Sequence, residues 1–94
     1  MQVTLEFFGI SRLVVGSKEL SLDLEDGTTF REIVRLLSTK YPPLMENVVS
    51  PDGETLQEPN IFNQNAQRMI KDSEMDGAVQ DGDRIILMSM AAGG

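Results

Sequence analysis

One stretch of helical periodicity, flanked by segments of period two, limits the folds open to this chain. Apolar residues recur at helical spacing and give a single stripe, formed by Phe30, Ile33, Val34, Leu37 and Tyr41. Thr29 and Glu32 have the spacing of a capping box, which satisfies free backbone N–H groups where a helix begins. Pro42 and Pro43 follow the stripe, and a residue before proline disfavours the α region. The sequence therefore predicts one main helix.

Three segments, residues 2–8, 18–24 and 84–90, alternate between apolar and polar side chains, as half-buried strands do. The side chains expected to face the core are Val3, Leu5, Phe7, Leu20, Leu22, Leu24, Ile85 and Leu87. A turn over 9–17, with glycine near both ends, joins the first two segments and predicts an antiparallel hairpin. Since the first and last segments are the most apolar, we expect them to lie centrally in the sheet.

The rest of the chain, mainly residues 44–80, is less regular. Short strands are expected at Val48-Val49, Ile61-Phe62 and Arg68-Met69-Ile70, and turns at Ser50-Pro51-Asp52-Gly53, Asn63-Gln64-Asn65 and Asp81-Gly82-Asp83. Residues 71–80 are polar, and we expect a loop there with at most one turn of 3₁₀ helix.

One helix stripe and one inward face on each strand build two layers around one core. The order of these elements predicts the α+β fold called the β-grasp, or ubiquitin-like fold: a mixed sheet of four to five strands packed on one main helix. A chain of 94 residues is large enough for one such core. We expect residues 1–90 to form this domain and 91–94 to form a flexible C-terminal Gly-Gly tail.

The chain contains no cysteine and no histidine, which excludes disulfides, thiolate nucleophiles and thiolate or imidazole metal sites. A formal charge of −7 argues against nucleic acid as a partner, and it fits either basic protein partners or plain solubility. Neither a membrane-spanning stretch nor the pattern of a signal peptide is present, so we expect a cytoplasmic protein. No bound metal or cofactor is expected, because Asp81-Gly82-Asp83 has the composition of a turn.

The printed sequence ends in Ala91, Ala92, Gly93 and Gly94. Glycine has no Cβ, so its backbone can pass through a slot too narrow for other residues. Two glycines after an apolar strand predict a thin stalk that carries the carboxylate of Gly94 into another protein's active site. The plainer alternative is a frayed or appended terminus without a role.

Four stretches, VTLEFFGISRLVVGS, LEDGTTFREIVRLL, NIFNQ and QDGDRIILMSMAAGG, together resemble one family. It comprises the small subunit of molybdopterin synthase and the thiamine sulfur-carrier proteins, the prokaryotic relatives of ubiquitin. The spacing between the Asp-Gly-Asp turn and Gly-Gly is the most specific part of the resemblance. Gln64 stands where a glycine is common. Ser89 and Met90 stand where many molybdopterin-type members have Pro-Pro, and a serine there resembles the ubiquitin-related modifier branch.

The resemblance implies a carrier without catalytic residues of its own. An ATP-dependent enzyme of the ubiquitin-activating type would adenylate Gly94, and a persulfide sulfur would displace AMP to leave a thiocarboxylate. The expected acceptor is the large subunit of molybdopterin synthase; thiamine synthesis and tRNA thiolation are other acceptors. An alternative role is a modifier joined through Gly94 to lysines of target proteins. A further alternative is an interaction module whose tail is incidental.

A partner that acts on the tail needs a docking surface on the folded domain. Phe8 has the wrong parity for the core, and Ile86, Met88 and Met90 have the corresponding parity on the last strand. If those two strands are neighbours, the side chains form an exposed apolar patch beside the tail, and such patches often mark partner sites. We therefore expect Phe8, Ile86, Met88 and Met90 to contact a partner, unless the loop at 44–60 covers them.

Overall fold

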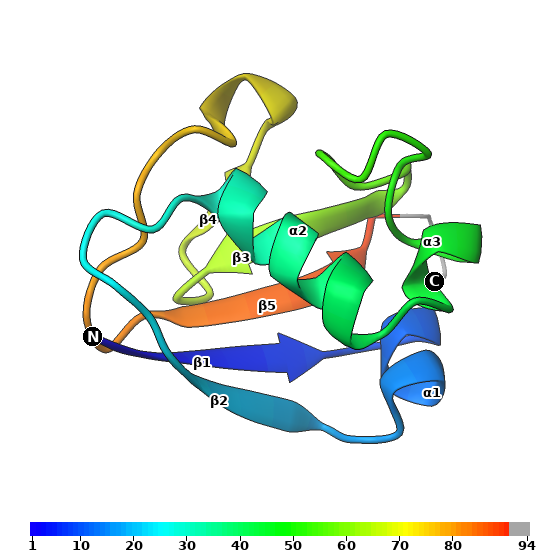
Figure 1. Cartoon of the computed structure of the whole chain (residues 1–94), viewed down its shortest axis with the longest axis horizontal. Helices are drawn as coiled ribbons and strands as arrows, with labels where there is room; N and C mark the ends of the chain where they lie inside the picture. The colour runs from blue at the N-terminus through cyan, green and yellow to red at the C-terminus, as the bar shows by residue number, and fades with distance from the viewer. Residues whose placement is uncertain (91–94) are drawn as a thin grey trace.

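The computed structural model describes residues 1–90, and these form a mixed five-stranded sheet with helices packed on it (Figure 1). The strands are β1 (Gln2–Phe7), β2 (Glu19–Asp23), β3 (Asn60–Gln64), β4 (Arg68–Ile70) and β5 (Arg84–Ser89). Their order across the sheet is β2-β1-β5-β3-β4. The β1–β5 pair is parallel, and the other three pairs are antiparallel. This arrangement confirms the β-grasp prediction and the inner positions of the first and last strands.

Helix α2 (Phe30–Lys40) crosses one face of the sheet and buries its predicted stripe there (Figure 1). The Thr29 hydroxyl accepts a hydrogen bond from the Glu32 backbone N–H at 3.1 Å. The Glu32 carboxylate in turn accepts from the Thr29 backbone N–H at 3.2 Å, so the capping box is complete. The helix ends at Lys40, and its C-cap residue Tyr41 stands directly before the two prolines, as the sequence predicts.

The core lies between α2 and the sheet. From the two inner strands it takes the side chains of the predicted parity: Val3, Leu5, Phe7, Ile85 and Leu87, each at most 1% exposed. From α2 it takes Phe30, Ile33, Val34 and Leu37. The three leucines of the edge strand and its flank, Leu20, Leu22 and Leu24, are only partly buried and pack against this cluster. Burial on one face of β1 and β5 fixes which side chains remain on the other face.

The prediction of a simple turn over residues 9–17 is wrong. A short helix, α1 (Ile10–Val15), forms there between Gly9 and Gly16. Both glycines have positive φ, 62° and 78°, and so allow the chain to turn sharply into and out of six helical residues. The segment is too short to show a helical repeat, so its sequence pattern does not distinguish it from a loop.

The Val48-Val49 strand is also wrong. Residues 44–47 form helix α3 (Leu44–Asn47), and the pairing nearby is an isolated bridge between Val49 and Leu56. Leu44, Val48 and Val49 are fully buried, because this segment closes the end of the core instead of extending the sheet.

The turn expected over residues 63–65 begins later, at Asn65, because Asn63 and Gln64 belong to β3. Asn65 and Ala66 have positive φ, 57° and 59°, as a tight hairpin between antiparallel strands requires. The polar stretch after β4 holds one 3₁₀ turn, η1 (Asp72–Glu74), as predicted. Within residues 1–90, no helix is both long and apolar enough to cross a membrane.

Candidate functional site

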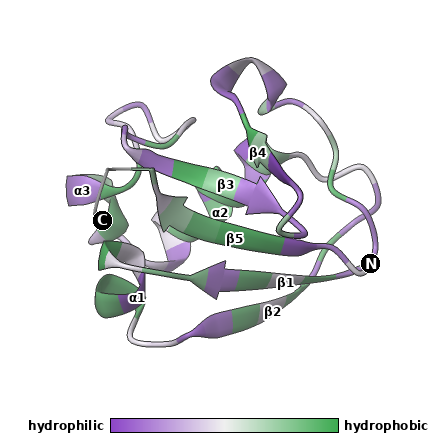
Figure 2. Cartoon of the chain, turned by 180° about the vertical axis from the view of Figure 1, so that it is seen from behind, coloured by the Kyte–Doolittle hydropathy of each residue, from purple (hydrophilic) through white to green (hydrophobic). Residues whose placement is uncertain are grey.

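The face of the sheet opposite α2 carries the side chains that the core excludes. Leu5 and Phe7 of β1 lie opposite Ile85 and Leu87 of β5, and all four point into the core. Their neighbours in sequence therefore point outward. Seen from behind, β5 and the middle of β3 form a hydrophobic band on this face (Figure 2).

A shallow hollow of about 400 Å³ lies on this outer face. Its lining consists of Phe8, Gly9, Asn63, Ala66, Met69, Ile86, Met88 and Ser89, and we call it the sheet-face hollow. The structure thus brings together Phe8, Ile86 and Met88 as strand parity predicted. Phe8 is 45% exposed. No residue of 44–60 lines the hollow, so this loop does not cover the three side chains.

Asn63 and Met69 belong to this hollow but were not among the expected residues. They lie opposite each other on β3 and β4, and Asn63 also lies opposite Ile86 on β5. The Asn63 side-chain amide donates to the Met69 sulfur at 3.3 Å. The sequence does contain a signal for Asn63, because it follows buried Phe62 and so points to the opposite face if the strand continues. The prediction that the strand ends at Phe62 left Asn63 out.

Polar pairs border the apolar part of this face. The Arg12 guanidinium lies 4.7 Å from the centre of the Phe8 ring, and its Nε donates to the Phe7 carbonyl at 2.8 Å. On the other side, Arg84 forms an ion pair with Glu6 and a longer one, of 3.5 Å, with Glu19. The hollow therefore has an apolar floor with fixed charges around it, which is the usual anatomy of a protein-binding surface.

Met90 does not line the sheet-face hollow. Its backbone N–H donates to the Pro59 carbonyl at 2.7 Å, which fixes the chain just after β5. Its side chain is 54% exposed and lines a different hollow of 390 Å³, together with Pro59 and Ile61. The tail residues proposed from the sequence, Ala91, Ala92, Gly93 and Gly94, lie outside the described residues.

The Asp-Gly-Asp turn before β5 is built around the carboxylate of Asp83. This carboxylate accepts hydrogen bonds from Gln64 Nε2 at 2.8 Å, Asn65 Nδ2 at 2.9 Å and the Gln80 backbone N–H at 2.8 Å. Burial by itself would raise the pKa of Asp83, but the three hydrogen bonds outweigh it and hold the pKa below its ordinary value. The turn thereby sets where β5 starts, and with it the position of Ile86 and Met88.

The same turn carries no metal-binding arrangement. Across residues 1–90, no group of three or more acidic residues is placed to hold a metal ion. Asp81 instead accepts from the Gln2 backbone N–H at 2.7 Å, and Asp83 is occupied by its three donors. Both carboxylates therefore serve to join the start of β1, the β3–β4 turn and the start of β5.

No protein-family model matches the chain. Comparison with single proteins does find relatives. The chain is 30% identical to small archaeal modifier protein 3 of Haloferax volcanii over 94 residues, which is 100% of both chains. It is also similar to the solution structure of Urm1 from Trypanosoma brucei, with a TM-score of 0.77 and 27% identity over 99% of this chain and 95% of that one.

A more distant solved structure is the complex of subunits 1 and 2 of the molybdopterin-converting factor from Helicobacter pylori. Its TM-score is 0.62 and its identity 20%, with both chains covered completely. At that identity the likeness concerns the fold. The match to the archaeal modifier protein covers both sequences from end to end, and the β-grasp topology agrees with it. The chain belongs to the family of ubiquitin-like β-grasp sulfur carriers and protein modifiers that includes the small archaeal modifier proteins.

Proposed function

We propose that this chain is a protein modifier and sulfur carrier that acts through the carboxylate of Gly94. The observation that carries the proposal is the end-to-end match, at 30% identity, to a small archaeal modifier protein. The absence of cysteine and histidine from the sequence supports it, because the usual side-chain nucleophiles and bases are missing. The chain is then a substrate of other enzymes and has no catalytic residue.

A carboxylate is a poor electrophile and must be activated before it reacts. In the proposed first step, a carboxylate oxygen of Gly94 attacks the α-phosphorus of ATP on a partner enzyme, and pyrophosphate leaves. ATP is used by that enzyme and is not bound by this chain alone. The acyl-adenylate can then react with a lysine amine of a target protein, so that an isopeptide bond forms and AMP leaves. When the outer sulfur of a persulfide attacks instead, AMP leaves and an acyl disulfide forms. A thiol then attacks the other sulfur of that disulfide, which releases the thiocarboxylate on Gly94 and leaves a new disulfide on the donor.

The sheet-face hollow is the proposed docking surface for the activating enzyme. Its apolar lining includes two methionines, and methionine side chains adapt to differently shaped partners. Adaptability suits a carrier that must meet an activating enzyme first and an acceptor afterwards. Met90, exposed and anchored through Pro59, stands where the tail leaves the domain, and we propose that it contacts the partner as the tail enters the active site.

Conjugation to lysines is favoured as the main outcome. The relative at 30% identity is called a modifier protein. The likeness to Urm1 agrees with the ubiquitin-related modifier branch, which Ser89 resembles. Sulfur donation to molybdopterin synthesis is the second candidate. It is favoured by the sequence resemblance and by the likeness in fold to the molybdopterin-converting factor, whose subunit 1 was solved in complex with subunit 2. The large subunit of molybdopterin synthase would be the acceptor in that case.

The test compares the full chain with a variant lacking Gly93 and Gly94, each expressed in the cell that normally makes it. Immunoblots with an antibody against the folded domain should show additional high-mass bands for the full chain only. Intact-mass analysis of the unconjugated fraction should show replacement of one oxygen by sulfur when the chain also carries sulfur. Identical band patterns for the two proteins, together with an unmodified mass for the full chain, would rule the proposal out.

A further inference from the structure

Helix α1 leaves part of its apolar surface uncovered by the rest of the fold. Its buried residue is a serine: Ser11 is 1% exposed, and its hydroxyl donates to the Phe8 carbonyl at 2.8 Å. Val14 and Val15 pack against the core, but two other apolar residues face outward, with Leu13 82% exposed and Ile10 43% exposed. A surface helix normally turns its apolar stripe toward the core. Figure 2 shows α1 as a mainly hydrophobic element at one end of the molecule.

Contacts at both ends of α1 hold it in this orientation. Gly9 and Gly16 bound the helix with positive φ, which other residues rarely adopt. The Arg12 side chain is tied to the Phe7 carbonyl and lies over the Phe8 ring. A rotation that buried Leu13 would break the Ser11 and Arg12 hydrogen bonds. These local contacts therefore fix Leu13 in its exposed position. Packing within the domain does not explain why this apolar area is exposed.

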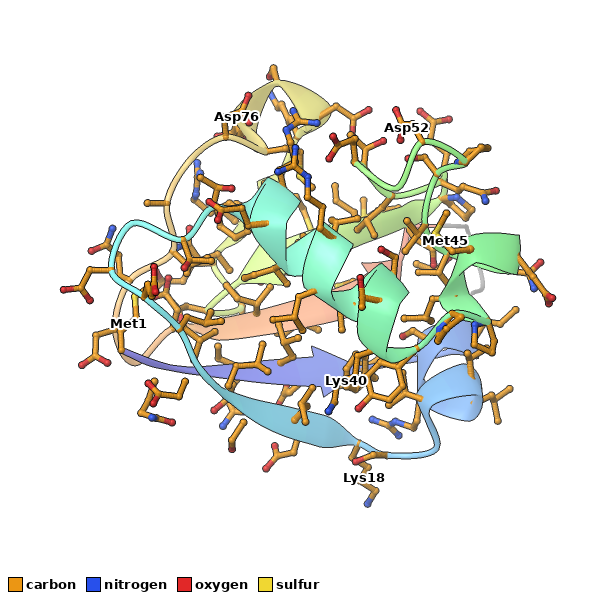
Figure 3. The ribbon with its side chains drawn as sticks, in the orientation of Figure 1. Met1, Lys18, Lys40, Met45, Asp52 and Asp76 are labelled. Carbon is orange, nitrogen blue, oxygen red and sulfur yellow. The ribbon has the colours of Figure 1, made fainter. Side chains whose placement is uncertain are left out.

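Two cations stand beside this apolar area. Arg12 and Lys18 line a shallow hollow of 320 Å³ together with Leu13, Gly16 and Ser17. Within residues 1–90, neither cation pairs with a carboxylate, whereas Arg31, Arg35, Arg68 and Arg84 all do. Figure 3 shows Lys18 projecting away from the ribbon next to α1, on the side remote from the acidic residues Asp52 and Asp76. A basic spot is thus preserved on a chain with a net charge of −7.

We propose that Ile10, Arg12, Leu13 and Lys18, here called the α1 surface, bind an acidic segment of a partner protein. In this arrangement, an apolar side chain of the segment packs on Leu13 and Ile10. Carboxylates on either side of it pair with Arg12 and Lys18, for which the described residues of the chain supply no carboxylate partner. Complementary charge orients such a segment, and burial of Leu13 supplies affinity.

The proposal goes beyond the function proposed above, because it does not depend on Gly94 or on the sheet-face hollow. An anionic membrane is the other surface that apolar and basic side chains suit. It is disfavoured because a protein with a charge of −7 is repelled from a negatively charged bilayer. Two cations do not offset that repulsion over the whole face of the protein. A short acidic peptide contacts only the α1 surface, and salt screens it from the more distant negative charges.

The test is an NMR titration of the isotope-labelled full chain with a short synthetic peptide in which aspartates and glutamates flank one leucine. Shifts should concentrate on Ile10, Leu13 and Lys18, and added salt should weaken binding. Leu13→Ser should weaken it about tenfold, since most of the buried apolar area is lost. Lys18→Gln should weaken it about threefold, as an exposed ion pair does. Lys71→Gln removes the same charge elsewhere and should leave the affinity unchanged.

Several results would overturn the proposal. One is the absence of shifts, and another is their concentration at Met69 and Ile86 in the sheet-face hollow. A third is equal affinity for a peptide in which lysines replace the acidic residues. Binding to phosphatidylserine vesicles without binding to the acidic peptide would assign the surface to membranes instead. Because Leu13 is exposed, spectra of the Leu13→Ser variant should match the wild type outside α1, which separates lost binding from lost folding.

Discussion

The carboxylate of Asp83 accepts a hydrogen bond from Asn65 Nδ2 at 2.9 Å and so joins the turn before β5 to the turn between β3 and β4. Asn65 completes the link, since its Oδ1 accepts from the Arg84 backbone N–H at 2.8 Å. These contacts fix the start of the strand that carries Ile86 and Met88. The position of the sheet-face hollow therefore depends on a turn at the opposite end of β5.

Asp83→Ala should destabilise the fold. The substitution leaves Gln64, Asn65 and the Gln80 backbone N–H without their acceptor, and hydrogen bonds to a charged group contribute about 1.5–3 kcal/mol to stability. We expect a loss of about 2–3 kcal/mol in the free energy of unfolding, measured by urea denaturation. Asp26→Ala, at an exposed position in the turn before α2, is the control and should change stability by less than about 0.5 kcal/mol.

Asp83 should also make stability depend on pH. Folding lowers the pKa of its carboxyl group, so its contribution is complete above the unfolded pKa of about 3.9. That contribution disappears as the pH falls through the lower, folded pKa. The difference in melting temperature between the wild type and Asp83→Asn should therefore shrink as the pH falls from about 6 to about 2. A difference that stays constant over this range would show that the charge of Asp83 is not responsible.

Removal of the N-terminal cap of α2 tests the element from which the fold was predicted. Thr29→Ala eliminates the hydroxyl that accepts from the Glu32 backbone N–H, and should lower the free energy of unfolding by about 1 kcal/mol. Thr29→Ser keeps the hydroxyl and should retain most of the stability. Thermal denaturation of the three proteins compares them directly, and equal losses for Ala and Ser would contradict a capping role.

A charge placed in the sheet-face hollow should impair function without affecting the fold. Met88→Glu adds a carboxylate to an outward-facing position of β5, where it would have to lose its hydration on docking. We expect a fall of at least about tenfold in the rate of conjugate formation, with stability changed by less than about 1 kcal/mol. Thr39→Glu adds the same charge at an exposed position of α2, which covers the opposite face of the sheet, and should keep the wild-type rate.

The sequence predicts those parts of the fold that repeat a pattern over several residues. Strand alternation predicts that Phe7 and Leu87 are buried and that Phe8 and Met88 lie on the other face, because one face of a central strand must be covered. The capping residues Thr29 and Glu32 fix the start of α2 for an equally local reason. These regularities were enough to predict the topology and three residues of the sheet-face hollow.

Features set by tertiary contacts could not be predicted in this way. Helix α1 spans only six residues, and its orientation depends on the Ser11 hydroxyl and on Arg12, both of which bond to β1 or to the residue after it. Val48 and Val49 favour strand by composition, yet they close the end of the core after a short helix. Asn63 joins the hollow only because β3 continues further along β5 than its composition indicates.

The central claim, that the chain acts through activation of Gly94, is tested most directly by isotope exchange between pyrophosphate and ATP. The activating enzyme from the same organism is incubated with labelled pyrophosphate, ATP and either the full chain or a variant lacking Gly93 and Gly94. Reversible formation of an acyl-adenylate predicts exchange of label into ATP with the full chain and none with the shortened one. Equal exchange with both chains, or none with either while the same enzyme activates another Gly-Gly protein, would contradict the account.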